Sequence, residues 1–105
     1  MQDFPQTDSF NDLQKYLEVV LKKRGFYDEP LPIKLMILTE EVGELARGIR
    51  KHTGVLMSET TKRSEVADEV ADVCMILFDI CNKLDINLFE AIKHKEEINS
   101  NRTWK

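Results

Sequence analysis

Apolar residues recur every three or four positions along most of the chain, which is the spacing of helices that bury one face. Four segments show this pattern, at residues 10–21, 33–49, 66–84 and from 88 onward. No segment alternates apolar and polar residues as a half-buried strand would. The sequence therefore predicts an all-α fold in which four helices pack as a bundle.

Residues that stop or start helices lie between these segments. Gly25 follows the first segment as a stop, and the proline-containing residues 28–32 break the chain and start the second helix. Ser64 is the expected N-cap of the third helix. Asn87 and Glu90 are spaced as in a capping box, so we expect the fourth helix to begin there.

The length of 105 residues predicts a single domain, residues 1–105, whose small core favours completion by homo-oligomerisation. A hydrophobic share of 42% excludes a disordered chain, and the formal net charge of −4 argues against binding to a nucleic-acid polymer. We expect no signal peptide and no membrane span. Cys74 and Cys81 lie about 10 Å apart on one predicted helix, too far for a disulfide, so we expect a cytoplasmic location.

Two pairs of carboxylates interrupt the apolar faces of the second and third helices. Glu41 lies within the apolar stripe of the second helix, and Glu44 lies about 60° away on the same side. Glu69 and Asp72 repeat the arrangement in the third helix, directly before its most apolar part at Val73. Burying an unpaired carboxylate costs several kcal/mol, so a positive charge must compensate these acids.

Two kinds of compensation are open. The first is salt bridging on a solvated face by the nearby basic residues, which are Arg47, Arg50, Lys51, Lys62 and Arg63. The second is a metal ion held by converging carboxylates. Small residues would let the two helices approach, and these are Gly43, Gly48, Ala67 and Ala71. An all-oxygen site suits Mg²⁺, with Mn²⁺ as a substitute, and the absence of a Cys or His cluster in the sequence disfavours zinc.

The fourth predicted helix changes from apolar to basic along one side. Lys95, Asn99 and Arg102 continue the stripe that begins with Leu88 and Ile92. Long basic side chains in this position can bind phosphate oxygens, and Arg can do so with two parallel hydrogen bonds. Cations at a solvated helix end, where they interact favourably with the helix dipole, are the alternative interpretation.

The paired carboxylates resemble a known signature. Glu41-x-x-Glu44 followed by Glu69-x-x-Asp72-Val73 is similar to the metal-binding motif of the all-α nucleoside triphosphate pyrophosphohydrolases of the MazG type. The resemblance implies a four-helix MazG-like bundle in which these four carboxylates hold Mg²⁺ and are catalytic. It implies hydrolysis of nucleoside triphosphates, above all deoxynucleoside triphosphates, to the monophosphate and pyrophosphate. A house-cleaning role on canonical or modified nucleotides fits such an activity.

The C-terminal residues extend the resemblance, which covers roughly residues 31–104. Lys95-x-x-x-Asn99-x-x-Arg102 is similar to the family's phosphate-binding tail. Lys34, two turns before Glu41, is a further candidate for contact with the substrate phosphates. Family members form dimers or tetramers whose sites are completed across subunits, so the resemblance implies a homodimer or homotetramer.

Several alternatives remain open at this point. Phe26, Tyr27 and Trp104 either stack on a nucleobase or pack in the core. The related phosphoribosyl-ATP pyrophosphatase of histidine biosynthesis resembles this fold and motif and is an alternative activity. The third possibility is a helical interaction module without enzymatic activity, whose acidic turns serve interhelical salt bridges or partner docking.

Overall fold

The computed structural model describes residues 3–26, 28–53 and 63–102, except for the side chains of Arg63 and Ser64. Its helices are α1 (Phe10–Lys23), α2 (Leu31–His52), α3 (Arg63–Lys83) and α4 (Leu88–Ser100). The described residues contain no strand, so the predicted all-α fold of four helices is confirmed. None of these helices is long and apolar enough to span a membrane.

The helix ends lie close to their predicted positions. Gly25, with a φ of 82°, follows α1 in the left-handed conformation that commonly ends a helix. The Asn87 side chain accepts a hydrogen bond from the Glu90 amide at 2.9 Å, which confirms the predicted cap of α4. The described part of α3 runs from Arg63, so Ser64, the predicted cap, lies within the helix and that prediction is wrong.

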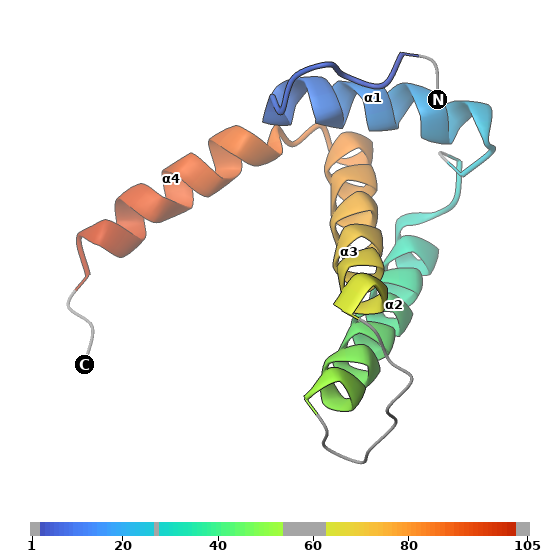
Figure 1. Cartoon of the computed structure of the whole chain (residues 1–105). Helices are drawn as coiled ribbons and strands as arrows, with labels where there is room; N and C mark the ends of the chain where they lie inside the picture. The colour runs from blue at the N-terminus through green and yellow to red at the C-terminus, as the bar shows by residue number, and fades with distance from the viewer. Residues whose placement is uncertain (1–2, 27, 54–62, 103–105) are drawn as a thin grey trace.

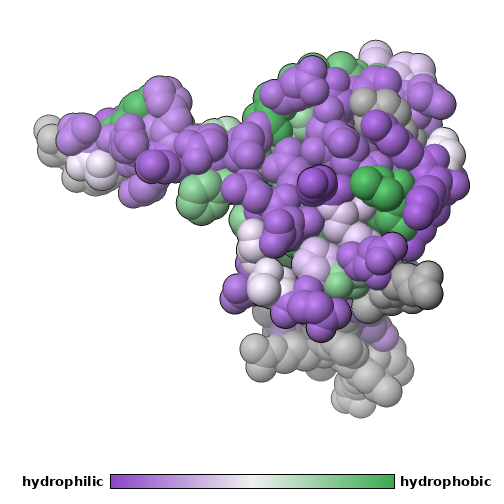
Figure 2. Space-filling model, turned by 90° about the horizontal axis from the view of Figure 1, so that it is seen from above, coloured by the Kyte–Doolittle hydropathy of each residue, from purple (hydrophilic) through white to green (hydrophobic). Residues whose placement is uncertain are grey.

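α2 and α3 form an antiparallel pair, and α1 crosses one end of that pair (Figure 1). α4 leaves the end of α3, contacts α1 near its own start and then runs away from the pair (Figure 1). Seen from above, α4 extends as an arm from the rest of the molecule (Figure 2). The expected packing of the fourth helix against the other three is therefore not found within one chain.

The core of the described residues lies where α1 crosses α3. Its buried apolar side chains are Leu17, Phe78 and Cys81. The Phe10 ring lies 5.0 Å from the Phe78 ring, between centroids, and joins α1 to α3. This core is small for the part of the chain that the structure describes.

Gln14 of α1 fixes the turn between α3 and α4 through buried polar contacts. Its side-chain nitrogen donates to Asn82 Oδ1 at 3.0 Å and to the Ile86 carbonyl at 2.7 Å. Its side-chain oxygen accepts from the Leu88 amide at 3.0 Å, and the Asn82 side chain donates to the Gln14 carbonyl at 3.1 Å. Fully satisfied buried polar groups specify one arrangement of the elements they join. Gln14 thus sets the direction in which α4 leaves α3.

Large apolar side chains remain exposed on the helices that this core does not cover. On α2 they are Ile33, Leu35, Met36, Val42 and Ile49. On α4 they are Phe89, Ile92 and Ile98. Leu35 and Met36 are each 59% exposed and Ile92 is 52% exposed. Exposed apolar residues that gather on particular surfaces mark sites that another molecule covers.

Candidate functional site

Three of the four predicted carboxylates come together between α2 and α3. Glu41 projects from α2, and Glu69 and Asp72 project from α3. Each offers one carboxylate oxygen to a group whose oxygens all lie within 4.8 Å of one another. Glu41 and Glu69 are half-buried and Asp72 is exposed, so the cluster is accessible from solvent. An all-oxygen set at this separation is the kind of site that a hard divalent cation occupies.

Helical spacing explains why these side chains meet. Glu69 and Asp72 are three residues apart on α3 and therefore share one side of that helix. Gly48 of α2 faces α3, where an added Cβ would lie 3.8 Å from Val66 and 3.9 Å from Glu69. Gly43 has no atom within 4 Å of the position of an added Cβ, so the predicted role of Gly43 in close helix approach is wrong. The reason is that its open side does not face α3.

Glu44 is exposed and lies outside the group of converging oxygens. It lies beside Glu69 in the lining of a neighbouring pocket rather than among the converging oxygens. Glu44 nevertheless acts on the cluster electrostatically. Partial burial, together with the negative charges of Glu41, Asp72 and Glu44, raises the pKa of the Glu69 carboxyl above its usual value. A role for Glu44 as a metal ligand stays a prediction.

Neighbouring cations do not neutralise the cluster in the part of the chain that the structure describes. Within residues 3–26, 28–53 and 63–102, no ion pair joins Arg47, Arg50 or Lys51 to the clustered carboxylates. Lys62 and the side chain of Arg63 lie outside the described residues. The salt-bridge interpretation is thus not realised by the three basic residues of α2. The raised pKa of Glu69 is consistent with carboxylates that face mainly one another.

An apolar pocket of about 310 Å³ adjoins the cluster, with Glu41 and Asp72 in its lining. Its apolar walls come from the end of α1, the α1–α2 connection, α2 and α3, and they are formed by Leu21, Phe26, Ile37, Met75 and Ile76. Phe26 is 49% exposed, so the interpretation of this ring as core packing is wrong. Tyr27 and Trp104 lie outside the described residues.

A second pocket, of about 260 Å³, lies further along α2 and α3 and differs in character. It is lined by charged side chains, among them Glu44, Glu69, Arg47 and Lys51. Glu69 therefore borders the charged pocket, while Glu41 and Asp72 border the apolar one. The carboxylate cluster lies between an apolar surface and a charged surface, which suits a ligand with one apolar end and one ionic end.

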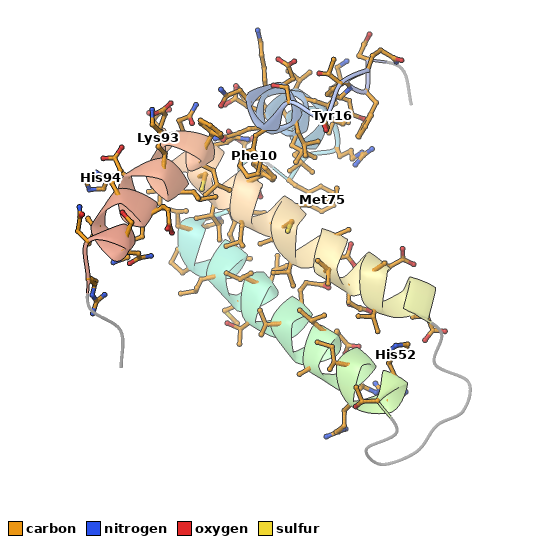
Figure 3. All side chains as sticks on the ribbon, turned by 60° about the vertical axis from the view of Figure 1, so that its left-hand side comes forward. Phe10, Tyr16, His52, Met75, Lys93 and His94 are labelled. Atoms are coloured by element: carbon orange, nitrogen blue, oxygen red, sulfur yellow. The ribbon has the colours of Figure 1, made fainter. Side chains whose placement is uncertain are left out.

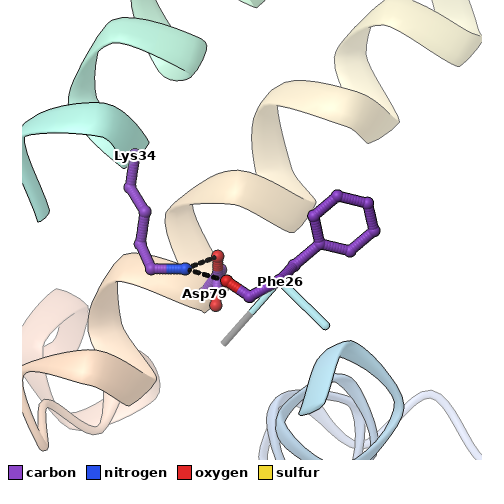
Figure 4. A network of polar contacts seen from close by, with 3 residues as sticks. All are labelled: Phe26, Lys34 and Asp79. Atoms are coloured by element: carbon purple, nitrogen blue, oxygen red, sulfur yellow. Dashed lines mark hydrogen bonds and ion pairs between the residues drawn. The ribbon is translucent and has the colours of Figure 1, made fainter. Parts of the chain in front are cut away.

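Lys34 is buried rather than presented to a substrate phosphate. It is 2% exposed, and its ammonium donates to Asp79 Oδ2 at 2.7 Å and to the Phe26 carbonyl at 2.7 Å (Figure 4). Lys34 also belongs to the lining of the apolar pocket. Asp79 was not among the predicted site residues. Its place in the sequence could have identified it, because it lies between Phe78 and Ile80 in the most apolar part of α3. A carboxylate buried there needs a cation to compensate its charge.

The predicted phosphate-binding residues lie far from the cluster within one chain. Lys95 and Asn99 belong to α4, and Arg102 follows its end, so all three lie on the arm that leaves the α2–α3 pair (Figure 1). His52 lies in the last turn of α2 and His94 on α4, and neither joins the carboxylate cluster (Figure 3). One chain alone therefore does not bring the basic residues of α4 to the carboxylates.

The fold and the site define a class of protein: an all-α chain with a carboxylate cluster, suited to a divalent cation, between two antiparallel helices. No protein-family model matches the chain. The chain is 33% identical over 87 residues to the uncharacterised protein YpjD of Bacillus subtilis. This match covers 78% of this chain and 76% of YpjD. The crystal structure of YpjD, described as a "putative pyrophosphatase", matches with a TM-score of 0.74 at 29% identity. That match covers 94% of this chain and all of the YpjD chain. The chain belongs to the family of YpjD.

Proposed function

We propose that the protein is a Mg²⁺-dependent pyrophosphohydrolase of the MazG type, which hydrolyses nucleoside triphosphates, above all deoxynucleoside triphosphates, to the monophosphate and pyrophosphate. The observation that carries the proposal is the convergence of Glu41, Glu69 and Asp72 within 4.8 Å. The pyrophosphatase description of the YpjD structure supports the same reaction class. A house-cleaning role on nucleotides would follow from this activity.

The carboxylates present fit Mg²⁺. Each bond to this ion is about 2.1 Å long, so oxygen ligands lie about 3.0 Å apart on adjacent octahedral positions and about 4.2 Å apart on opposite ones. Oxygens that already lie within 4.8 Å of one another can converge on one ion through side-chain rotation. Mg²⁺ keeps several water ligands and binds substrate phosphates, so three carboxylates are a sufficient protein contribution. The bound ion would lower the pKa of a water molecule and neutralise charge on the phosphates.

The pocket beside the cluster favours an organic pyrophosphate over inorganic pyrophosphate as the substrate. Inorganic pyrophosphate has no apolar part, whereas a nucleotide carries a base that can fill an apolar pocket of about 310 Å³. Phe26 offers a half-exposed aromatic ring in that pocket, on which a base can stack. The base and the triphosphate would then lie on the apolar and the carboxylate sides of one continuous site.

The proposal includes a homodimer or homotetramer. α4 carries Lys95, Asn99 and Arg102 away from the carboxylates of its own chain, and its apolar side chains at Phe89 and Ile92 stay exposed. A second copy whose own apolar surfaces cover α4 would bury these side chains and could bring the basic residues to a substrate. Association of two surfaces that each lack a covering partner is favoured by the hydrophobic effect.

The direct test is a product analysis with a substrate panel. Purified protein is incubated with Mg²⁺ and each deoxynucleoside triphosphate, each ribonucleoside triphosphate, phosphoribosyl-ATP and inorganic pyrophosphate, and the products are separated by chromatography. We expect a nucleoside monophosphate and pyrophosphate. Release of orthophosphate, or hydrolysis of inorganic pyrophosphate alone, would contradict the proposal, and preferential turnover of phosphoribosyl-ATP would indicate the alternative activity.

A matched pair of variants connects the activity to the cluster. Glu41→Gln removes one clustered carboxylate, whereas Glu40→Gln changes an exposed acid on the same helix outside the cluster. We expect Glu41→Gln to abolish hydrolysis and the rise in melting midpoint caused by Mg²⁺, and Glu40→Gln to retain both. Equal activity of the two variants, or no effect of Mg²⁺ or Mn²⁺ on wild-type melting, would favour the non-enzymatic interaction module.

A further inference from the structure

Lys34 lies at the meeting point of three elements. It projects from the first turns of α2, its ammonium contacts Asp79 of α3, and the same ammonium contacts the Phe26 carbonyl in the connection between α1 and α2 (Figure 4). Both distances are 2.7 Å. At 2% exposure it is the most deeply buried large side chain in the described part of the chain. Lys34 therefore joins α2, α3 and the α1–α2 connection through one buried ammonium group.

The contact with Phe26 completes the placement of the α1–α2 connection. Gly25 turns the chain after α1. The Phe26 amide then donates to the Leu21 carbonyl at 3.0 Å, which fixes the amide side of Phe26. The Phe26 carbonyl accepts the Lys34 ammonium at 2.7 Å and, at a longer 3.4 Å, the Glu29 amide. A hydrogen bond from a charged donor is about twice as strong as a neutral one. Lys34 is therefore the principal contact on the carbonyl side.

An ion pair is not needed here for packing alone. Replacing a buried ion pair by apolar side chains of similar volume is often neutral or stabilising. An apolar residue at position 34 could fill the space between α2 and α3, but it could not donate a hydrogen bond to a carbonyl. The feature that the ammonium adds is thus the fixed position of Phe26. Phe26, whose side chain is half-exposed, belongs to the lining of the pocket that also includes Glu41 and Asp72.

We infer that Lys34 is a positioning residue for substrate binding: through the Phe26 carbonyl it holds the Phe26 ring as the wall of the pocket that receives the base of the nucleotide. This inference rests on the proposed function. It assigns Lys34 an indirect role, in which it acts on the base through Phe26 rather than on the phosphates by contact. Asp79 serves Lys34 by neutralising its charge at a buried site.

The test replaces the ion pair as a unit, so that no buried charge is left without its partner. The variant Lys34→Met/Asp79→Leu is compared with wild type, with Phe26→Ala and with the triple variant. We expect the pair variant and Phe26→Ala each to raise KM for the preferred nucleotide roughly fivefold or more, the size of losing one base–aromatic stack, with kcat changed less than about twofold. The triple variant should have a KM within about twofold of Phe26→Ala, because the pair acts only through that ring.

Two controls separate positioning from loss of stability. Asp79→Asn leaves the ammonium without its anion but able to donate to the Phe26 carbonyl, so it should lower the melting midpoint while KM stays within about twofold of wild type. Asn82→Leu disrupts the buried contacts with Gln14, away from the pocket, and should lower the melting midpoint without raising KM. A second pair variant, Lys34→Met/Asp79→Asn, gives the same comparison if the first does not fold.

The inference is overturned if the pair variant keeps the wild-type KM, or if its effect multiplies with that of Phe26→Ala in the triple variant. The dissociation constant of a nonhydrolysable nucleotide, measured by calorimetry on the same proteins, should change in parallel with KM. Wild-type protein that neither hydrolyses nor binds any nucleotide refutes the proposed function, and the inference with it. If the wild type is active and the pair variant has the same KM as the wild type, the inference is refuted but the proposed function is not.

Discussion

Replacing Lys34 alone should destabilise the protein much more than replacing Lys34 and Asp79 together. The ammonium is 2% exposed and the Asp79 side chain 12% exposed, and 2.7 Å separates their charged atoms. Lys34→Met leaves a buried carboxylate without its cation, which costs about 3–5 kcal/mol. Loss of the hydrogen bond to the Phe26 carbonyl adds about 1 kcal/mol. Asp79→Leu leaves the buried ammonium without its anion and should cost a similar amount.

These values are large for a small domain, whose total free energy of unfolding is about 5–15 kcal/mol. A loss of about 3 kcal/mol lowers the melting midpoint by roughly 12–24 °C in a domain of this size. In Lys34→Met/Asp79→Leu both charges are gone, so we expect a stability at least about 2 kcal/mol above that of either single variant. The coupling between the two sites should then amount to several kcal/mol.

Urea unfolding followed by circular dichroism measures these free energies. All four proteins are compared at one protein concentration, because the proposed self-association would add a stability that rises with the logarithm of concentration. The reasoning is refuted if the double variant is destabilised by the sum of the two single effects. It is also refuted if Lys34→Met costs less than about 1 kcal/mol, the value expected for a solvent-exposed pair.

Three further predictions concern the cluster and the arm. Asp72→Asn should abolish Mg²⁺-dependent protection against melting and lower hydrolysis by about 100-fold or more, measured beside Glu40→Gln as the control. Because Glu69 has a raised pKa in the folded state, the folded protein binds the extra proton, so metal-free stability should fall as the pH rises through the range just above 4.5. Urea unfolding in the presence of a chelator should show a weaker fall for Glu69→Gln, and an equal fall would contradict the assignment. Ile92→Asp should shift the proposed homo-oligomer toward the monomer in sedimentation experiments, whereas the neighbouring exposed change His94→Asp should not.

The helices could be predicted from the sequence because the signals that define them are local. Apolar spacing, the stop at Gly25 and the cap at Asn87 depend on residues a few positions apart, and the structure has these features where expected. The direction of α4 could not be predicted in the same way. It depends on Gln14, which contacts Asn82 and Leu88 from a distant part of the sequence. Apolar spacing also shows which side of a helix requires burial, but not whether the same chain or another provides it.

The carboxylate cluster was predictable in part for the same reason. The spacing of Glu69 and Asp72 places both on one face of α3, and the position of Glu41 in an apolar stripe directs it toward α3. Whether Glu44 joins them depends on the rotation of α2 about its axis, which sequence spacing does not define. The Lys34–Asp79 pair depends on the register of α2 against α3, so the sequence alone could indicate Lys34 only as a candidate for contact with the substrate phosphates.

The same register places the Lys34–Asp79 pair and the carboxylate cluster in one interface between α2 and α3. Lys34 and Glu41 are seven residues apart on α2, and Asp79 and Asp72 are seven residues apart on α3. Because the two helices are antiparallel, α2 meets α3 in two successive layers: Lys34 faces Asp79 in one, and Glu41 lies near Asp72 in the other. The first layer pairs an acid with a base from the same chain. In the second layer, Glu41 occupies the α2 position that corresponds to Lys34. Asp72 therefore faces another acid instead of a base. The buried acid Asp79 is thus compensated within the chain, whereas the half-buried Glu41 and Glu69 and the exposed Asp72 have no such ion pair among the described residues. The Mg²⁺ of the proposed function would supply the missing positive charge.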